Sequence, residues 1–164
     1  MLFRSWIWAI STDGSAAEIA QIQDARIRAV RRPANSGHPG KVRNQALRLA
    51  QGAYCAFLDA DDAWLPEKLA RQVAYMEAHP EFLFSHTGCR VIDADGKDLY
   101  VRHGGIYPPP GDCFADLVKH CFICTSTVMV RTELVGRVGD FSEEDCFRSG
   151  QDYEFFVRCA KATG

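Results

Sequence analysis

The sequence has no long apolar run, no strong net charge and no export signal. No stretch approaches the ~20 consecutive apolar residues that a membrane-spanning helix needs. Residues 1–10 are apolar apart from one arginine and one serine, but they lack a signal-peptide cleavage pattern. The formal net charge of the 164 residues is −2, so no bulk field attracts nucleic acid or an anionic membrane. These absences argue against a transmembrane helix and against a nucleic-acid partner.

The cysteines and histidines also lack a metal-binding pattern. The seven cysteines are odd in number, and several lie inside apolar segments. Cys121 and Cys124 have the spacing of a zinc knuckle, but no second pair and no paired histidines follow at a suitable distance. We therefore expect buried, reduced thiols, Cys121 and Cys124 included, and a reducing compartment such as the cytoplasm.

Length and patterning predict one α/β domain over residues 1–164. Segments with strand character alternate with segments of helical periodicity. In the first half we expect strands at 6–10, 26–30 and 54–58 and helices at 16–23 and after a loop at 33–40. The latter helix would bury Val42, Ala46 and Leu49 and would end at Gly52. A third helix, near Pro66, would bury Leu65, Leu69, Val73 and Met76.

The second half continues the alternation. We expect strand material at 82–92, an irregular loop at 104–111, a short helix around 114–118, a strand at 122–130 and an acidic loop at 139–150. A final helix would bury Tyr153, Phe156, Val157 and Ala160. Residues 54–58 are apolar at every position, which is typical of a strand buried on both faces of a mostly parallel, Rossmann-like sheet.

Three carboxylates follow that apolar strand. Asp59, Asp61 and Asp62 would repel one another unless a cation or solvent separates them. Ligands of open parallel sheets bind beyond the carboxyl ends of the strands, and clustered carboxylate oxygens suit Mg²⁺ or Mn²⁺. A solvated acidic turn at the start of the next helix explains the same residues equally well. The cluster alone leaves both interpretations open.

The surrounding segments resemble family-2 glycosyltransferases. In order, these segments are Thr12-Asp13-Gly14-Ser15, Asn35-Ser36-Gly37, Arg43-Asn44-Gln45-Ala46, the strand leading into Asp59-Ala60-Asp61-Asp62, and Trp64-Leu65-Pro66-Glu67-Lys68-Leu69. The resemblance covers residues 6–164 and implies a GT-A fold. The sequence lacks the strand and helix with which family members begin, so we expect a partial, truncated domain.

The resemblance also implies site residues. Asp13 matches the acid that contacts the nucleotide base, although Thr12 stands where a second acid is common. Arg43 and Asn44 match a helix start beside the nucleotide, and Arg43 as a plain surface cation is the alternative. Asp59 and Asp61 match donor-sugar ligands, and Asp61 and Asp62 match the metal ligands of the Asp-x-Asp motif.

One further carboxylate carries the expected chemistry. Gln151-Asp152 resembles the family's acidic pair, with Gln151 in place of the usual Glu, so Asp152 would be the catalytic base. A helix N-cap is the alternative role for Asp152.

The implied reaction is a metal-assisted, inverting sugar transfer. The donor would be a UDP-, GDP- or dTDP-sugar, and the acceptor a saccharide or lipid-linked hydroxyl of a cell-envelope polysaccharide. Such a protein would be cytoplasmic, or peripheral to the inner face of the membrane. A nucleotide-sugar-binding fragment without turnover is the alternative. An aspartyl-phosphate phosphatase fits poorly, since Ala63-Trp64 follows the carboxylates. Because the missing first strand would leave a sheet edge open, a homodimer is expected.

Overall fold

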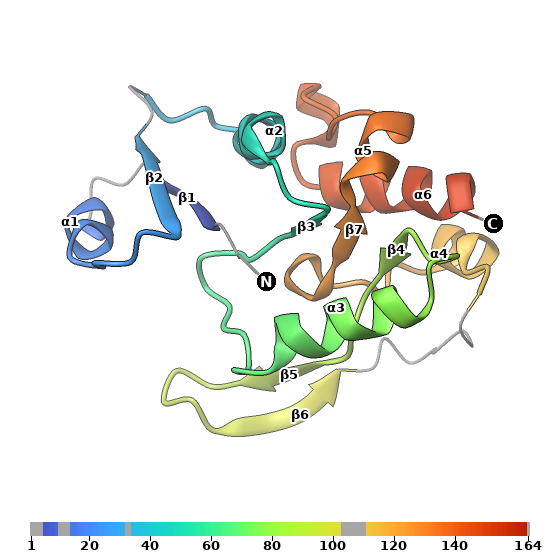
Figure 1. Ribbon diagram of the computed structural model, residues 1–164, viewed down its shortest axis with the longest axis horizontal. Coiled ribbons are helices and arrows are strands. Elements are labelled where there is room, and N and C mark those ends of the chain that lie inside the picture. Colours follow the sequence, from blue (N-terminus) through green and yellow to red (C-terminus); the bar gives the residue numbers. More distant parts are fainter. Residues whose placement is uncertain (1–4, 10–13, 32–33, 103–110, 164) are drawn as a thin grey trace.

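The computed structural model describes residues 5–9, 14–31, 34–102 and 111–163. Its helices and strands alternate along the chain, which confirms the α/β class (Figure 1). No helix in these ranges is both long and apolar enough to cross a bilayer.

The N-terminal part is a small strand–helix–strand unit. It consists of β1 (Ser5–Ala9), α1 (Ser15–Ala20) and β2 (Ile27–Arg31), with β1 and β2 parallel and Trp6 opposite Arg28. In Figure 1 this unit, coloured blue, lies to one side of the remaining elements. The predicted strands and helix in this region are therefore confirmed, with shifts of a few residues at their ends.

A three-stranded sheet forms the centre of the molecule. β3 (Tyr54–Ala56) and β4 (Phe84–Ser85) both pair with β7 (Met129–Arg131), which runs antiparallel to each of them. β3 and β4 therefore run in the same direction and are connected through the helix α3 (Lys68–Ala78). β7, which comes later in the sequence, lies between them in the sheet. Among the described strands, only β1 and β2 pair in parallel, so the expected mostly parallel sheet is not what these strands form.

The remaining elements surround this sheet. A hairpin of β5 (Cys89–Ile92) and β6 (Asp98–Arg102) projects below α3 in Figure 1. The others are α2 (Pro39–Leu49), α4 (Phe114–Lys119), the 3₁₀ turn η1 (Thr125–Thr127), α5 (Thr132–Val138), the 3₁₀ turn η2 (Asp145–Phe147) and α6 (Gln151–Thr163). The expected strand at 122–130 is mostly η1 and its flanks, and α5 was not expected.

An aromatic group joins the sheet to α6. Phe141 stacks on Phe155 with ring centroids 4.1 Å apart, and Phe57 meets Phe141 edge-on at 5.2 Å. Such contacts add to the hydrophobic gain from burying the rings. Phe155 is fully buried, yet the predicted stripe of the final helix omitted it; of that stripe, Phe156 and Ala160 are buried and Tyr153 and Val157 are half-buried.

Several expected buried positions are exposed. Leu58, at the end of the strand, is 47% exposed, and Leu65 is 67% exposed, whereas Leu69 packs beside the buried Val73 and Met76. Leu49 of α2 is exposed and Val42 and Ala46 are only half-buried, because the buried face of α2 carries Gly40 and Asn44 instead.

The seven cysteines are all free, but they do not share one environment. Cys55 and Cys159 are buried, as expected, whereas Cys121 and Cys146 are exposed and the other three are intermediate. The expectation that Cys121 packs in the core is therefore wrong.

Candidate functional site

The loop after β3 carries the clustered carboxylates on a fixed backbone. The amide of Asp62 donates to the carbonyl of Asp59 (3.2 Å), which closes a turn. The amide of Asp59 in turn donates to the hydroxyl of Ser126 in η1 at 2.9 Å. We name residues 59–62 the acidic loop. η1 therefore holds the acidic loop through Asp59, the first residue of the loop.

The side chain of Asp59 is already engaged. Arg43 of α2 donates to Asp59 Oδ1 at 2.5 Å, and this arginine side chain is only 15% exposed. Its guanidinium also lies over the ring of Phe141, 5.7 Å from the centroid. Arg43 Nη1 is buried and has no hydrogen-bond partner among the described residues. This pairing fits poorly with the interpretation of Arg43 as a plain surface cation.

Asp61 and Asp62 differ from Asp59 in having no such partner. Both are exposed, and in the described part of the chain neither carboxylate forms a hydrogen bond or ion pair. No three potential ligand side chains are grouped there in a way that could hold a metal ion. Two free carboxylates on one turn fit part of the oxygen shell of Mg²⁺ or Mn²⁺, which these ions complete with phosphate oxygens and water.

Trp64 and Lys68 follow the acidic loop and lie against each other. The Trp64 indole N–H donates to the carbonyl of Ser126 at 2.7 Å, and Lys68 Nζ lies 4.3 Å from the centre of the indole ring. Burial lowers the pKa of Lys68 to about 8. Ser126 thus contacts the chain on both sides of Asp61 and Asp62.

Asp152 is bonded to the neighbouring residue of η1. Its Oδ2 accepts a hydrogen bond from the Thr125 hydroxyl at 2.9 Å, and its Oδ1 accepts one from the backbone amide of Tyr153 at 2.8 Å. α6 begins at Gln151, so Asp152 lies inside the first turn, and the N-cap position expected as its alternative role is not the one it occupies. Gln151 is 3% exposed, and its side-chain oxygen has no partner among the described residues.

The segment from 121 to 127 contacts both the acidic loop and Asp152. Burial, the neighbouring Cys89 and the negative charge of Asp62 raise the pKa of Cys124 to about 11. Burial, and then the charge of Asp152, raises the pKa of Cys121.

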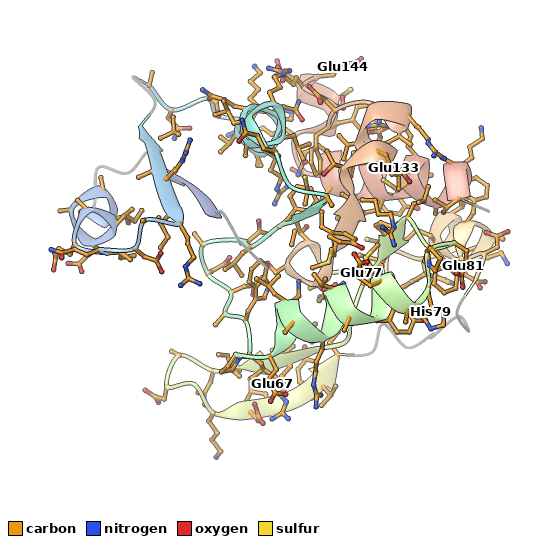
Figure 2. All side chains as sticks on the ribbon, in the orientation of Figure 1. Glu67, Glu77, His79, Glu81, Glu133 and Glu144 are labelled. Atoms are coloured by element: carbon orange, nitrogen blue, oxygen red, sulfur yellow. The ribbon has the colours of Figure 1, made fainter. Side chains whose placement is uncertain are left out.

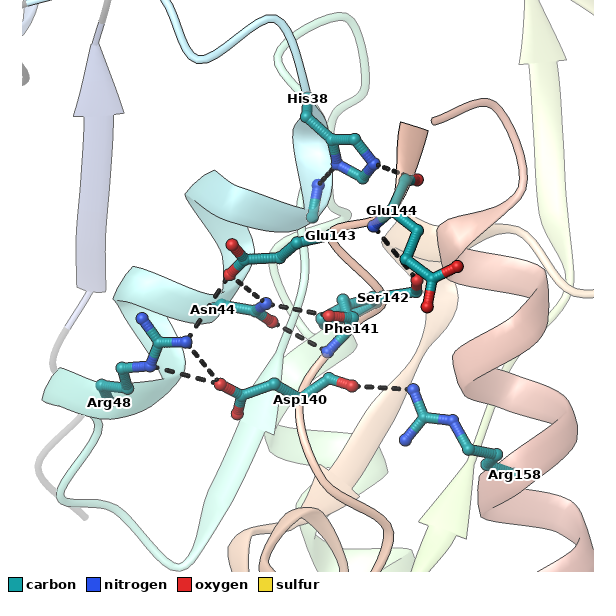
Figure 3. Close-up of polar contacts among 10 residues, drawn as sticks. His38, Asn44, Arg48, Asp140, Phe141, Ser142, Glu143, Glu144 and Arg158 are labelled. Atoms are coloured by element: carbon teal, nitrogen blue, oxygen red, sulfur yellow. Dashed lines mark hydrogen bonds and ion pairs between the residues drawn. The ribbon is translucent and has the colours of Figure 1, made fainter. Parts of the chain in front are cut away.

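Asn44 has a structural position. It is fully buried, its side-chain amide donates to the carbonyl of Phe141 and to Glu143, and its side-chain oxygen accepts from the amide of Phe141 (Figure 3). Because Asn44 has no exposed surface and its side chain already has these partners, it cannot contact a nucleotide sugar. The expected substrate contact of Asn44 is therefore corrected to a role in holding residues 140–144 against α2.

Other residues of α2 hold the same segment. The N-cap residue His38 accepts from the amide of Gly40 and contacts the carbonyl of Glu144 at 3.1 Å, and Arg48 pairs with Asp140 (Figure 3). A Cβ at Gly40 would lie 2.6 Å from the carbonyl oxygen of Ser142, so only glycine permits this approach. Because Arg43 extends from the same helix, this clamp also positions its ion pair with Asp59.

The remaining site predictions have different outcomes. Asp13, expected at the nucleotide base, lies outside the described residues. Thr125 and Ser126 were missed because the apolar residues around them suggested a strand. The run of three hydroxyl residues Thr125-Ser126-Thr127 within that apolar segment was the available signal, since each is buried and needs a hydrogen-bond partner.

Two relatives with curated sequences are both named as glycosyltransferases. A glucosyltransferase of Escherichia coli, WfaP, named as transferring from UDP-Glc to α-D-GlcNAc-diphosphoundecaprenol, is 36% identical over 120 residues, covering 73% of this chain and 45% of that protein. An uncharacterised glycosyltransferase of Rickettsia felis is 34% identical over 159 residues, covering 92% of this chain and 25% of that one. The chain thus spans less than half the length of either relative.

A solved structure shows the same fold. The structure of S. aureus TarS residues 1–349 in complex with UDP has a TM-score of 0.66 and 21% identity, covering 97% of this chain and 46% of that one. The sequence model of the family described as "Glycosyl transferase family 2" matches residues 10–138. The chain belongs to glycosyl transferase family 2.

Proposed function

We propose that the chain binds a nucleoside diphosphate sugar at the acidic loop and transfers the sugar to an acceptor hydroxyl with Asp152 as the base. The observation that carries this proposal is that two adjacent residues of η1, Ser126 and Thr125, bond the acidic loop and Asp152, respectively. Donor ligands and a carboxylate base must lie close together for such a reaction, since the base must reach the hydroxyl that attacks the sugar.

The proposed displacement proceeds in one step with inversion. The acceptor hydroxyl oxygen forms a bond to the anomeric carbon, its proton passes to the Asp152 carboxylate, and the bond from that carbon to the diphosphate breaks. The nucleoside diphosphate leaves with the electron pair. Mn²⁺ or Mg²⁺ at Asp61 and Asp62 would neutralise charge on the diphosphate. Arg43 Nη1, which has no partner among the described residues, would donate a hydrogen bond to the nucleotide sugar.

We further propose UDP as the first nucleotide to test and a lipid-linked saccharide as the acceptor. The TarS structure contains UDP, and WfaP is named for a UDP-sugar donor and a diphosphoundecaprenol-linked acceptor. A lipid-linked acceptor would bring the chain to the inner face of the membrane from the cytoplasm, where its seven free cysteines would stay reduced.

Metal and nucleotide binding can be tested by thermal shift. Mn²⁺ and UDP together are expected to raise the melting temperature by more than the sum of their separate effects, because the ion bridges protein and diphosphate. Asp61→Asn/Asp62→Asn is expected to remove this excess. The control Glu67→Gln/Glu81→Gln removes the same charge near the two ends of α3, where Figure 2 shows both glutamates. Synergy that survives in the aspartate variant would place the site elsewhere.

Turnover distinguishes the enzyme from a binding module. UDP release from UDP-glucose and UDP-GlcNAc would be followed with a saccharide acceptor, and with water as the acceptor. Asp152→Asn is expected to keep the thermal shift and to abolish release, whereas Asp145→Asn, an exposed carboxylate of η2, is expected to retain both. Synergistic binding by a wild-type chain that releases no UDP would instead favour a nucleotide-sugar-binding module.

We also propose that two copies associate through the N-terminal unit. None of residues 14–30 is buried, and in the described chain β1 pairs with β2 alone. Uncovered strand edges recruit other chains. Light scattering over a concentration series is expected to show a rising mass, and a constant monomer mass would reject the dimer.

A further inference from the structure

We propose that Thr125 is a positioning residue for the base, a role that rests on the proposed function of Asp152. Thr125 is 6% exposed, and its hydroxyl donates to Asp152 Oδ2 at 2.9 Å. Thr125 belongs to a 3₁₀ turn that is far from Asp152 in sequence, so this hydrogen bond joins two separate parts of the fold at one carboxylate.

The bond restricts the orientation of the carboxylate. Oδ1 already accepts from the amide of Tyr153, which is fixed in the first turn of α6, and the Thr125 hydroxyl holds Oδ2. With both oxygens held, rotation of the carboxylate is opposed. A carboxylate accepts about four hydrogen bonds, so each oxygen keeps capacity for the proton of an acceptor hydroxyl.

The adjacent Ser126 performs a separate task. Its hydroxyl accepts from the amide of Asp59 and its carbonyl accepts from the Trp64 indole, so these bonds are to the acidic loop and to Trp64 just after it, and not to Asp152. Two neighbouring residues of one turn therefore bond the proposed donor-binding loop and the proposed base, respectively. Loss of the Thr125 hydroxyl should impair the chemical step, whereas loss of the Ser126 hydroxyl should impair donor binding.

Thr127 provides a matched control in the same turn. It is 5% exposed, and its hydroxyl donates to the carbonyl of Cys124 at 2.7 Å, within the turn. Thr125→Val and Thr127→Val each remove one buried hydroxyl from η1 while keeping the shape of the side chain. A fall in activity caused only by loosening of the turn would occur in both variants.

The kinetic test compares four variants for UDP release over a range of donor concentrations up to saturation. Thr125→Val is expected to lower kcat about 10- to 100-fold with the donor KM nearly unchanged, because misplacement of a reacting group by about 1 Å costs that much. Thr125→Ser, which retains the hydroxyl, should recover most of kcat, and Thr127→Val should remain near wild type. Ser126→Ala should raise the donor KM and the UDP concentration needed for the thermal shift.

A spectroscopic readout tests the bond independently of turnover. With aspartate ¹³C-labelled at the carboxyl carbon, the signal that disappears in Asp152→Asn identifies Asp152. This signal is expected to move in Thr125→Val and to stay in place in Thr127→Val.

Each result has a defined meaning. A full kcat in Thr125→Val, equal losses in both valine variants, or an Asp152 signal that does not respond to Thr125→Val would overturn the positioning role. If Asp152→Asn retained transfer, the proposed function itself would fail, whatever the threonine variants show.

Discussion

The N-terminal unit and the body around β7 are stabilised in different ways. None of residues 14–30 is buried, and a prominent polar contact, Asp24 with Arg26, joins residues two apart on the surface. The body has a buried aromatic group and buried polar side chains, such as Asn44 and Gln72, that bond segments distant in sequence. The acidic loop and Asp152 both belong to the body, so they should withstand changes in the N-terminal unit.

The largest expected effect comes from the aromatic group. Phe155→Ala is expected to lower the free energy of unfolding by about 3–5 kcal/mol, since it removes a buried ring that contacts Phe57 and Phe141. Ile19→Ala in the half-buried face of α1 should cost less than half as much. Chemical denaturation measures both, and similar losses would contradict the contrast between the two regions.

Asn44→Ala should follow, with a loss of about 2–3 kcal/mol, because it leaves the buried amide and carbonyl of Phe141 without partners. Arg48→Ala removes an exposed contact to the same segment and should leave the unfolding midpoint within error. Equal effects would mean that the segment is held from the surface and not by the buried amide.

Alkaline pH should destabilise the body through its thiols. Burial raises the pKa of Cys159 to about 12 from a reference value of 9. Between these values the unfolded chain releases a proton that the folded chain retains, so the free energy of unfolding falls by up to about 1.4 kcal/mol per pH unit. Under reducing conditions, Cys159→Ala should make this fall shallower between pH 9 and 11, where the raised pKa of Cys124 leaves a residual slope, and the exposed-thiol variant Cys146→Ala should not. An unchanged slope in Cys159→Ala would contradict the assignment.

The smallest effect is expected in the N-terminal unit. Arg26→Ala breaks the contact with Asp24, which holds the pKa of that carboxyl at about 2. Because both groups are at the surface, thermal melting at neutral pH should be unchanged. A loss as large as that of Asn44→Ala would show that this unit folds as one with the body.

The positions of the carboxylates near strand and helix ends were predicted from the sequence, whereas the residues that hold them were not. Asp59, Asp61, Asp62 and Asp152 lie where a strand or helix boundary was expected, because turn residues and apolar runs mark such boundaries locally. The roles of Asn44 and Thr125 depend on partners far along the chain, Phe141 and Asp152, and no local pattern encodes those contacts. The direction of β7 was likewise hidden, since a strand of three residues, two of them buried, can have the same composition whether it pairs parallel or antiparallel.

The adjacency of Thr125 and Ser126 has a mechanical consequence. Consecutive Cα atoms across a trans peptide are held about 3.8 Å apart, so the attachment points of the acidic loop and of Asp152 cannot separate while both bonds persist. Thermal motion of the surrounding helices should therefore change the distance between the acidic loop and Asp152 only slightly. A glycine inserted between residues 125 and 126 would move the two attachment points apart by about 2 Å along the 3₁₀ turn and rotate one about the turn axis relative to the other, which would break at least one of the two bonds while every side chain remained present.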